Sequence, residues 1–240
     1  MNDVDRQIRR RTRRSFLVGG AAALAGAGAW EWLRTRSQQD ELQWPLRGVL
    51  RANEKIARTY FSEGHTAATF DVSQAGMPRR NGTEGIEEPA DLARWKLNLV
   101  SPAGREIALG LDDIKALPRV EMVTELRCIE GWTQVVHWAG ARLRDFAAKY
   151  QMEAPYVGME TPDAGYYVGL DNASALHPQT LLCYEMQGAP LTQEHGAPLR
   201  LVIPVKYGVK NIKRIGTIKF QENRPADYWA EQGYDWYAGL

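Results

Sequence analysis

Short strand-like segments separated by Gly and Pro constrain the fold of this chain more than any other feature. Alternating apolar and polar residues recur near 94–100, 106–109, 120–127, 155–161, 165–170, 180–186, 199–205 and 212–220. Helical spacing is found over 50–62, 112–117 and 143–150. Because strands and helices do not alternate one for one, the pattern favours a β-rich α+β fold over a doubly wound parallel sheet. No G-x-G-x-x-G motif or phosphate-binding loop is found in the sequence.

The composition supports one sizeable hydrophobic core. The chain has 240 residues, of which 44% are hydrophobic and 25% charged, and this excludes collagen-like, coiled-coil and disordered proteins. A net charge of +1 gives no overall attraction to nucleic acid, so no nucleic-acid partner is expected. The two cysteines, Cys128 and Cys183, could form at most one disulfide. Cys183 lies in an apolar run and is interpreted as a core residue.

Residues 1–29 have the order of features that is typical of an export signal. They hold six Arg and two Asp, and the pair Arg13-Arg14 is followed by Ser-Phe-Leu-Val. An Ala- and Gly-rich run then leads to Ala27-Gly28-Ala29, a small-x-small cleavage site. This is the twin-arginine pattern. It predicts a signal segment over 1–29, a linker over 30–49 and a single domain over 50–240.

The same segment bears on location and cofactor. Its apolar run of about 15 residues is shorter than the ~20 that a membrane-spanning helix needs, which favours a periplasmic protein. Trp30, Trp32 and Trp44 alternate with Arg residues and suit a membrane interface, so a retained anchor and membrane association through the N-terminus stay open. Twin-arginine export carries folded proteins, and a frequent reason to fold first is a cofactor.

Cys128, at the end of a predicted strand, is the strongest candidate for a functional residue. It lies in Arg127-Cys-Ile-Glu-Gly-Trp132, where the neighbouring Arg127 favours the thiolate form. Thiolate is a soft metal ligand. From these residues alone, however, a buried and inert cysteine is the more common outcome, and Arg127 could equally pair with Glu125 or Glu130.

A second motif begins 67 residues later (195 − 128) and is basic. It reads His195-Gly-Ala-Pro-Leu-Arg200, then Pro204-Val-Lys-Tyr-Gly208, then Lys210-Asn-Ile-Lys213. Arg200 can bind a phosphate in bidentate fashion, and Lys210 and Lys213 can supply further donors. Taken alone, the stretch also fits a basic strand pair with solvated side chains.

Together the two motifs resemble the sulfite oxidase family of mononuclear molybdenum enzymes. The likeness extends through Val135-Val-His-Trp-Ala-Gly140, covers 50–240 and is closest to the exported catalytic subunits that resemble periplasmic methionine-sulfoxide reductases. It implies a molybdopterin-binding domain with molybdenum and molybdopterin as cofactors, and Cys128 as the catalytic residue and sole protein ligand of the metal. The other cofactor-binding positions that the resemblance implies are Asn53, Thr161, His195, Arg200, Asn211, Ile212 and Lys213.

The resemblance leaves the direction of the reaction open. It implies oxygen-atom transfer outside the cytoplasm, and the Cys-x-Glu-Gly-Trp motif favours reduction of S-oxides or N-oxides, including methionine-sulfoxide-type substrates. His195 and the availability of Arg127 agree with the sulfite oxidases, so sulfite oxidation is an alternative. Ile56 departs from the reductases, which have Tyr three residues after the position that matches Asn53. A non-catalytic binding protein that keeps the fold is another.

Electrons are expected to come from a separate protein. The sequence has no C-x-x-C-H haem attachment motif and no cysteine set for an iron–sulfur cluster. We therefore expect a separate cytochrome or a membrane haem subunit as the redox partner.

Two further segments have candidate roles. Residues 74–90 contain three Gly and two Pro with little apolar content, which predicts a long loop, and such loops are often functional. The C-terminal aromatic residues, Tyr228 to Tyr237, are interpreted as packing, with partner docking as the alternative.

Overall fold

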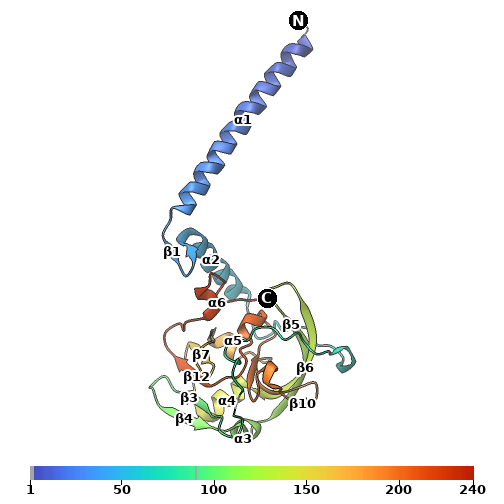
Figure 1. Cartoon of the computed structure of the whole chain (residues 1–240), viewed down its shortest axis with the longest axis vertical. Helices are drawn as coiled ribbons and strands as arrows, with labels where there is room; N and C mark the ends of the chain where they lie inside the picture. The colour runs from blue at the N-terminus through green and yellow to red at the C-terminus, as the bar shows by residue number, and fades with distance from the viewer. Residues whose placement is uncertain (1–2, 90) are drawn as a thin grey trace. The chain divides into compact units, whose positions relative to one another are not determined.

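The structure is a computed structural model that describes residues 3–89 and 91–240 (Figure 1). The chain divides into two compact units, one ending at Arg51 and the other spanning Ala52–Leu240. Helix α2, Trp44–Tyr60, contains the boundary between them.

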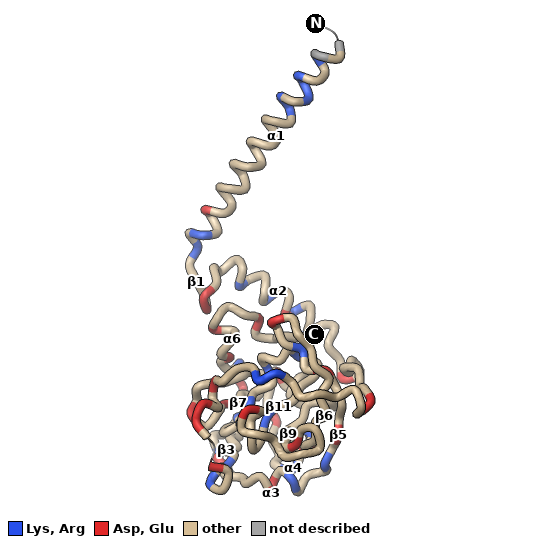
Figure 2. Tube along the Cα trace, turned by 45° about the vertical axis from the view of Figure 1, so that its right-hand side comes forward, with Lys and Arg blue, Asp and Glu red and all other residues tan. Residues whose placement is uncertain are grey.

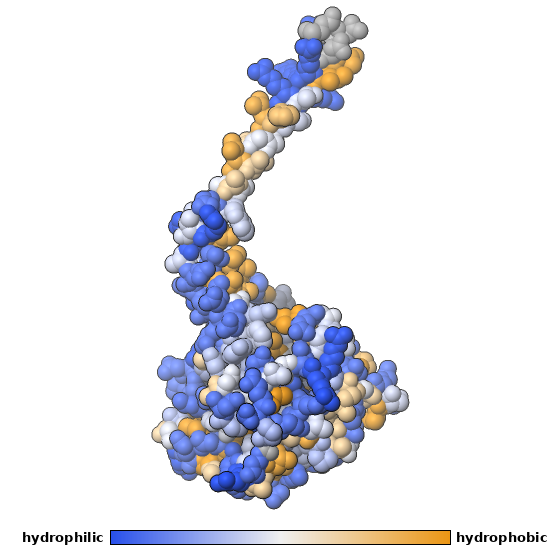
Figure 3. Space-filling model, viewed as in Figure 1, coloured by the Kyte–Doolittle hydropathy of each residue, from blue (hydrophilic) through white to orange (hydrophobic). Residues whose placement is uncertain are grey.

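The first unit consists mainly of helix α1, Asp3–Arg34. The strands β1, Gln38–Gln39, and β2, Leu42–Gln43, pair in a small antiparallel hairpin before α2 begins. Residues 30–49, expected as a linker, therefore hold the end of α1, this hairpin and the start of α2. Figure 2 shows the basic residues near the two ends of α1, and Figure 3 shows apolar residues along its length.

Helix α1 is longer than its apolar run because the flanking residues continue the helix. Over Arg6–Arg34 it is long and apolar enough to cross a membrane, by length and composition. A signal sequence near the N-terminus meets the same criterion. The expectation that this segment is too short to span a membrane is therefore wrong for the helix as a whole, while its role as a signal stays a prediction.

Two five-stranded sheets form the second unit. The first, in the order β10-β9-β6-β5 with β11 also on β9, is antiparallel: β5 Arg119–Arg127, β6 Thr133–Arg142, β9 Leu181–Met186, β10 Ala189–Pro190 and β11 Arg200–Val202. The second has the order β4-β3-β12-β7-β8: β3 Leu97–Val100, β4 Glu106–Leu109, β7 Tyr156–Glu160, β8 Tyr167–Asp171 and β12 Thr217–Gln221. In this sheet β12 and β3 are parallel and the other pairs are antiparallel.

Short helices connect the strands. The α-helices are α3 Leu111–Lys115, α4 Leu143–Tyr150, α5 Asn172–Ala175 and α6 Tyr228–Glu231. Three short 3-10 helices are η1 Val72–Gln74, η2 Gln193–His195 and η3 Gly208–Lys210. The β-rich α+β prediction is confirmed by this arrangement.

Residues of both sheets form the main hydrophobic core. Leu99 and Ile218 from the second sheet and Leu182 and Leu201 from the first belong to one buried cluster. Each fully buried aliphatic side chain of this kind contributes about 1.5–3 kcal/mol. The alternate residues of β9, including Cys183, enter a second cluster on the opposite face of their sheet. Cys183 is thus a core residue, as predicted.

The sequence pattern missed β6 and misplaced two strands. Several consecutive residues of β6 are buried, so this strand lacks the alternation that marks a half-buried strand. The predicted strand over 199–205 is shorter in the structure. The one predicted over 212–220 begins only at Thr217, because residues 211–216, which follow η3, form an irregular segment.

Candidate cofactor and active site

A cavity in the second unit gathers the two motifs that the sequence singled out. It contains about 920 Å³ of non-atom space, including its opening to solvent. Its wall comes from the turn 128–132, the loop 78–84, the segment 195–213 and the aromatic residues Trp229 and Tyr234. Residues that are far apart in the sequence therefore face one space.

Cys128 presents its thiol from a tight turn. The Cys128 N–H donates to the Trp132 carbonyl at 2.9 Å, and the Gly131 N–H donates to the Cys128 carbonyl at 3.1 Å. The turn closes directly after β5, where Arg127 pairs with Thr133 of β6. Cys128 is half-buried and lines the cavity, and its Sγ accepts a hydrogen bond of 3.4 Å from Asn81 Nδ2.

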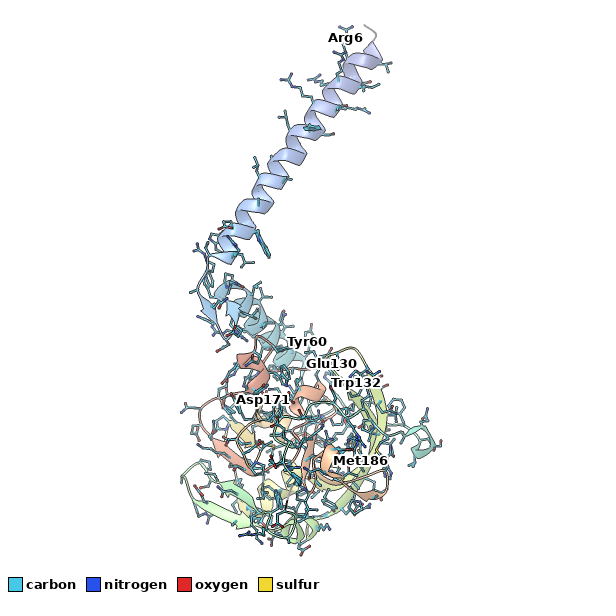
Figure 4. All side chains as sticks on the ribbon, viewed as in Figure 1. Arg6, Tyr60, Glu130, Trp132, Asp171 and Met186 are labelled. Atoms are coloured by element: carbon cyan, nitrogen blue, oxygen red, sulfur yellow. The ribbon has the colours of Figure 1, made fainter. Side chains whose placement is uncertain are left out.

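The neighbours of Cys128 in the turn also hold one another in place. Trp132 Nε1 donates to Glu130 Oε2 at 3.1 Å, and Figure 4 shows the two side chains close together. Both line the cavity. Arg127 instead pairs with Glu125, with Nη2 and Oε2 2.8 Å apart, so its charge is offset within the chain.

Arg200 is a buried cation that has no carboxylate partner among the described residues. Its Nη1 donates to the His195 carbonyl at 3.1 Å and its Nη2 to the Asn211 carbonyl at 3.2 Å. Its Nε has no hydrogen-bond partner in the described part of the chain, and the guanidinium lies 5.0 Å from the Trp138 ring centroid. Burial lowers the Arg200 pKa to about 10, so the group stays charged at neutral pH. Such a group favours an anionic ligand.

Lys213 and His195 complete the basic side of the cavity. Burial and the nearby Arg200 charge lower the Lys213 pKa to about 8, and its Nζ donates to the carbonyls of Asn81 at 2.6 Å and Gly82 at 3.0 Å. Burial, with Arg200 as the next cause, lowers the His195 pKa to about 4. Neutral imidazole can donate one hydrogen bond and accept another.

Gly196 allows these two segments to approach closely. Its φ is +96°, and a Cβ atom there would lie 2.8 Å from Lys213 Cβ and 2.9 Å from the Arg214 backbone nitrogen. Both the backbone conformation and the space therefore require glycine. In the same way, a Cβ on Gly208 would lie 3.3 Å from the Arg127 carbonyl oxygen, next to the Cys128 turn.

The structure brings together five of the eight predicted site residues: Cys128, His195, Arg200, Asn211 and Lys213 line the cavity. Asn211 is fixed by its own hydrogen bonds, since its Oδ1 accepts from Ile203 N at 2.9 Å.

The other three predicted residues do not line the cavity. Ile212 is fully buried in the main core, in an irregular segment where its carbonyl accepts from Leu201 N at 2.9 Å. Thr161 lies buried behind the cavity, where its Oγ1 accepts from Tyr166 N at 3.1 Å. Asn53 is exposed on α2. Their cofactor roles stay predictions.

Lys210 does not lie where the sequence predicted, beside the phosphate-binding residues. Its Nζ is buried and donates to the Asp227 carboxylate and to the Gly169 carbonyl at 2.9 Å, rather than facing the cavity. It is a structural cation and not a further phosphate donor.

Several lining residues were not predicted as site residues. Asn81 comes from the predicted long loop, where an Asn-Gly pair signals a turn. Tyr166, Trp229 and Tyr234 line the cavity, although the C-terminal aromatics were interpreted as packing. Trp236 and Tyr237 are buried, as that interpretation predicts.

The cavity defines a class of protein. It offers the buried cation Arg200, the half-buried cation Lys213 and amide donors for a large anionic ligand, beside a thiol that can bind a soft metal. No group of three or more His, Cys, Asp or Glu side chains that could hold a metal ion occurs in residues 3–89 and 91–240. The cavity therefore suits a large anionic organic ligand with a thiol beside it.

Comparison with known proteins places the chain in a family. A family model described as "Oxidoreductase molybdopterin binding domain" matches residues 84–229. The chain belongs to this family and is a molybdopterin-dependent oxidoreductase with molybdenum and molybdopterin as cofactors, as the sequence predicted.

The similar proteins carry a consistent name. "Putative protein-methionine-sulfoxide reductase subunit YedZ1" of Azospira oryzae is 30% identical over 248 residues, which are 99% of this chain and 91% of that protein. "Protein-methionine-sulfoxide reductase catalytic subunit MsrP" of Campylobacter jejuni is 35% identical over 61% of this chain and 56% of its own length. Its counterpart in Xanthomonas campestris is 37% identical over 58% of this chain and 48% of its own length. The chain thus spans about half the length of the two MsrP proteins.

A solved structure is similar in fold. The sulfane dehydrogenase SoxCD of Paracoccus pantotrophus matches with a TM-score of 0.53 and 16% sequence identity, over 57% of this chain and 40% of that chain. At this identity the likeness concerns the architecture.

Proposed function

We propose that this chain is the catalytic subunit of an exported molybdenum enzyme that reduces S-oxides, with methionine sulfoxide as the substrate class. One observation supports it above all: the cavity joins Cys128 to the buried Arg200, which has no carboxylate partner among the described residues. The direction is supported by the similar proteins that are named methionine-sulfoxide reductases.

In this proposal, different residues of the cavity bind different parts of the cofactor. Cys128 would bind molybdenum, and Arg200 and Lys213 would bind the phosphate of molybdopterin. Asn211 and His195 offer hydrogen bonds to the edges of the pterin ring. When bound, the cofactor supplies the two-electron oxygen-atom chemistry, and the protein supplies ligation, orientation and shape.

Two of the predicted cofactor residues act indirectly in this proposal. Thr161 holds Tyr166, whose ring lines the cavity and whose hydroxyl donates to the Val209 carbonyl at 2.6 Å. Ile212 anchors the backbone between Asn211 and Lys213 in the core. Asn53 is exposed on α2 and is proposed only by the resemblance.

The cavity lining suits the apolar part of a methionine-sulfoxide side chain. Ile129 is 41% exposed and Tyr234 is 38% exposed, and both line the cavity together with Trp132. Aromatic and aliphatic surfaces bind the sulfur-bearing side chain of methionine well. The Arg79 guanidinium, 6.0 Å from the Trp132 ring centroid, adds a donor for an S-oxide oxygen.

Electrons would come from a separate redox partner, a membrane haem subunit or a soluble cytochrome. The sequence has two cysteines and no C-x-x-C-H motif. It therefore offers no attachment site for a c-type haem and too few cysteines for an iron–sulfur cluster. In this proposal residues 1–29 are a twin-arginine signal or a retained anchor, 30–49 connect it to the enzyme, and 50–240 work in the periplasm.

A pair of assays on the purified holoenzyme tests the direction. Oxidation of a reduced dye with methionine sulfoxide is measured beside reduction of ferricyanide with sulfite, and Cys128→Ser is the control for both. The proposal expects turnover in the first assay. Turnover in the second assay alone would establish sulfite oxidation, the alternative that His195 supports by its resemblance to the sulfite oxidases. Turnover in neither would leave a binding protein with this fold.

A further inference from the structure

Helix α2 carries several of its large apolar side chains on the outside, while its smaller Ala57 packs against a buried cluster. Val49, Ile56 and Tyr60 are exposed at 56%, 57% and 73%. Glu54 of the same helix is buried, where its two oxygens contact Arg224 at 2.8 Å and Arg58 at 3.3 Å. In a helix on the surface of a soluble domain the apolar face is normally buried and the charges are exposed. Over these residues α2 has the reverse arrangement.

The exposed apolar residues form one continuous line, which we call the outer stripe. It consists of Leu46, Val49, Ala52, Ile56 and Tyr60, and all five are exposed. Their spacing of three or four residues places them on one face of the helix. Figure 3 shows apolar residues on the surface of the segment that Figure 1 labels α2.

The charges of α2 lie beside the stripe rather than on it. The helix has four basic residues against one acidic residue. By helix geometry Lys55 is exposed toward the Ala52 edge of the stripe, Arg51 is exposed on the far side of the helix, and Arg58 turns inward, with its Nε 3.4 Å from Asp171 Oδ2. An apolar face with an exposed cation toward its edge matches the boundary between acyl chains and anionic headgroups.

The segment before α2 supplies the reason to choose a membrane over a protein partner. The helix α1 is apolar and long enough to cross a membrane, and it ends at Arg34. The chain between Arg34 and the start of α2 at Trp44 can span at most about 35 Å when fully extended. Trp32 and Trp44 meet edge to face with ring centroids 6.3 Å apart, and the Arg36 guanidinium lies 5.1 Å from the Trp32 ring. Tryptophan and basic residues of this kind concentrate at the lipid–water interface.

We propose that α2 lies on the membrane surface, with the outer stripe in the boundary between headgroups and acyl chains and with Lys55 on lipid phosphates. This interfacial helix is a second membrane contact besides α1. It rests on the proposed export of the chain and is independent of the substrate.

Site-specific photocrosslinking in the full-length chain tests the proposal. A photoreactive phenylalanine analogue replaces Ile56 in one variant and Arg105, an exposed residue of the β3–β4 turn, in a matched control. Exported protein is irradiated in native membranes, and the adducts are identified by mass. We expect a phospholipid adduct at position 56 and none at position 105.

Other adducts at position 56 would overturn the proposal. A crosslink to a membrane subunit or to a second copy of this chain would assign the stripe to a protein interface. Absence of any adduct would leave the stripe in water. Cell fractionation, scored separately, reports whether export itself has failed, and the dye assay reports on the proposed reaction.

Discussion

Arg200 and Lys210 are two buried cations from one stretch of chain, and the groups that surround and stabilise their charges differ. Lys210 is 1% exposed and has the Asp227 carboxylate, the Gly169 carbonyl and the Trp236 ring around its Nζ. Arg200 is 3% exposed and has two carbonyls, the Trp138 ring and an Nε with no hydrogen-bond partner among the described residues.

The difference separates a cation that holds the fold from one that serves the ligand. A buried charge is stable only when the surroundings compensate for its lost hydration. The chain itself compensates Lys210, whereas in the proposed function Arg200 and the adjacent Lys213 would gain their compensating anion from the cofactor. Loss of Lys210's partner should therefore damage the empty protein, and loss of Arg200 should damage only cofactor binding.

The largest effect is expected from Asp227→Asn. This change leaves Lys210 buried without its counter-charge, and breaking such a pair costs about 3–5 kcal/mol of unfolding free energy. Chemical denaturation of the cofactor-free protein measures it. The exposed carboxylate variant Glu222→Gln is the control and should shift stability by less than about 0.5 kcal/mol. An equal, small effect of both variants would contradict the structural role of Lys210.

The next effect is expected from Arg200→Met. Loss of its charge-assisted hydrogen bonds, worth about 1.5–3 kcal/mol, should weaken cofactor retention by roughly ten- to a hundredfold. The unfolding free energy of the cofactor-free protein should stay the same or rise, because an apolar side chain replaces an uncompensated charge. Pterin and molybdenum per chain, measured beside denaturation curves, separate the two.

A fall in stability as large as that of Asp227→Asn would break this comparison. It would mean that Arg200 supports the fold through its contacts with the His195 and Asn211 carbonyls. Arg105→Met, on an exposed turn, controls for the loss of a surface guanidinium.

The part of the fold that depends on local pattern could be predicted from the sequence. Alternation of apolar and polar residues predicts the strand that ends at Arg127, just before Cys128, and the strands Tyr156–Glu160 and Tyr167–Asp171. Helical spacing predicts the helix Leu143–Tyr150. The strand β6 could not be predicted in this way, because tertiary packing buries its successive residues. The same holds for the outer stripe of α2, since a pattern shows that a face is apolar but not which way it points.

For the site, the residue types were predictable and the partners were not. A basic motif predicts cations near a phosphate, but which lysine faces the ligand depends on a carboxylate 17 residues away, Asp227. Likewise, Asn81 reaches Cys128 from a loop 47 residues earlier. Such contacts arise from the tertiary fold, and a single sequence does not contain them as a pattern.

A smaller effect is expected from the pH dependence of anion binding. Because the Lys213 pKa is lowered to about 8 in the cofactor-free protein, its positive charge is present below pH 8 and lost above it. Affinity for pyrophosphate should therefore fall by about tenfold between pH 7 and pH 9, which corresponds to the net worth of one hydrogen bond. The His195 pKa of about 4 keeps that group neutral over the same range.

Calorimetric titration at both pH values checks this expectation. Lys213→Met should bind pyrophosphate more weakly at pH 7 and lose the pH step. A step that persists in this variant would assign the titration to another group.

The most direct test of the account is the molybdenum and molybdopterin content per chain in wild type and Cys128→Ser from a molybdenum-replete host. We expect about one of each per wild-type chain, and loss of the metal or a changed metal spectrum in Cys128→Ser while the protein stays folded. A folded, exported wild-type chain free of both, or a variant with the same metal content and spectrum, would contradict a molybdenum centre held by Cys128.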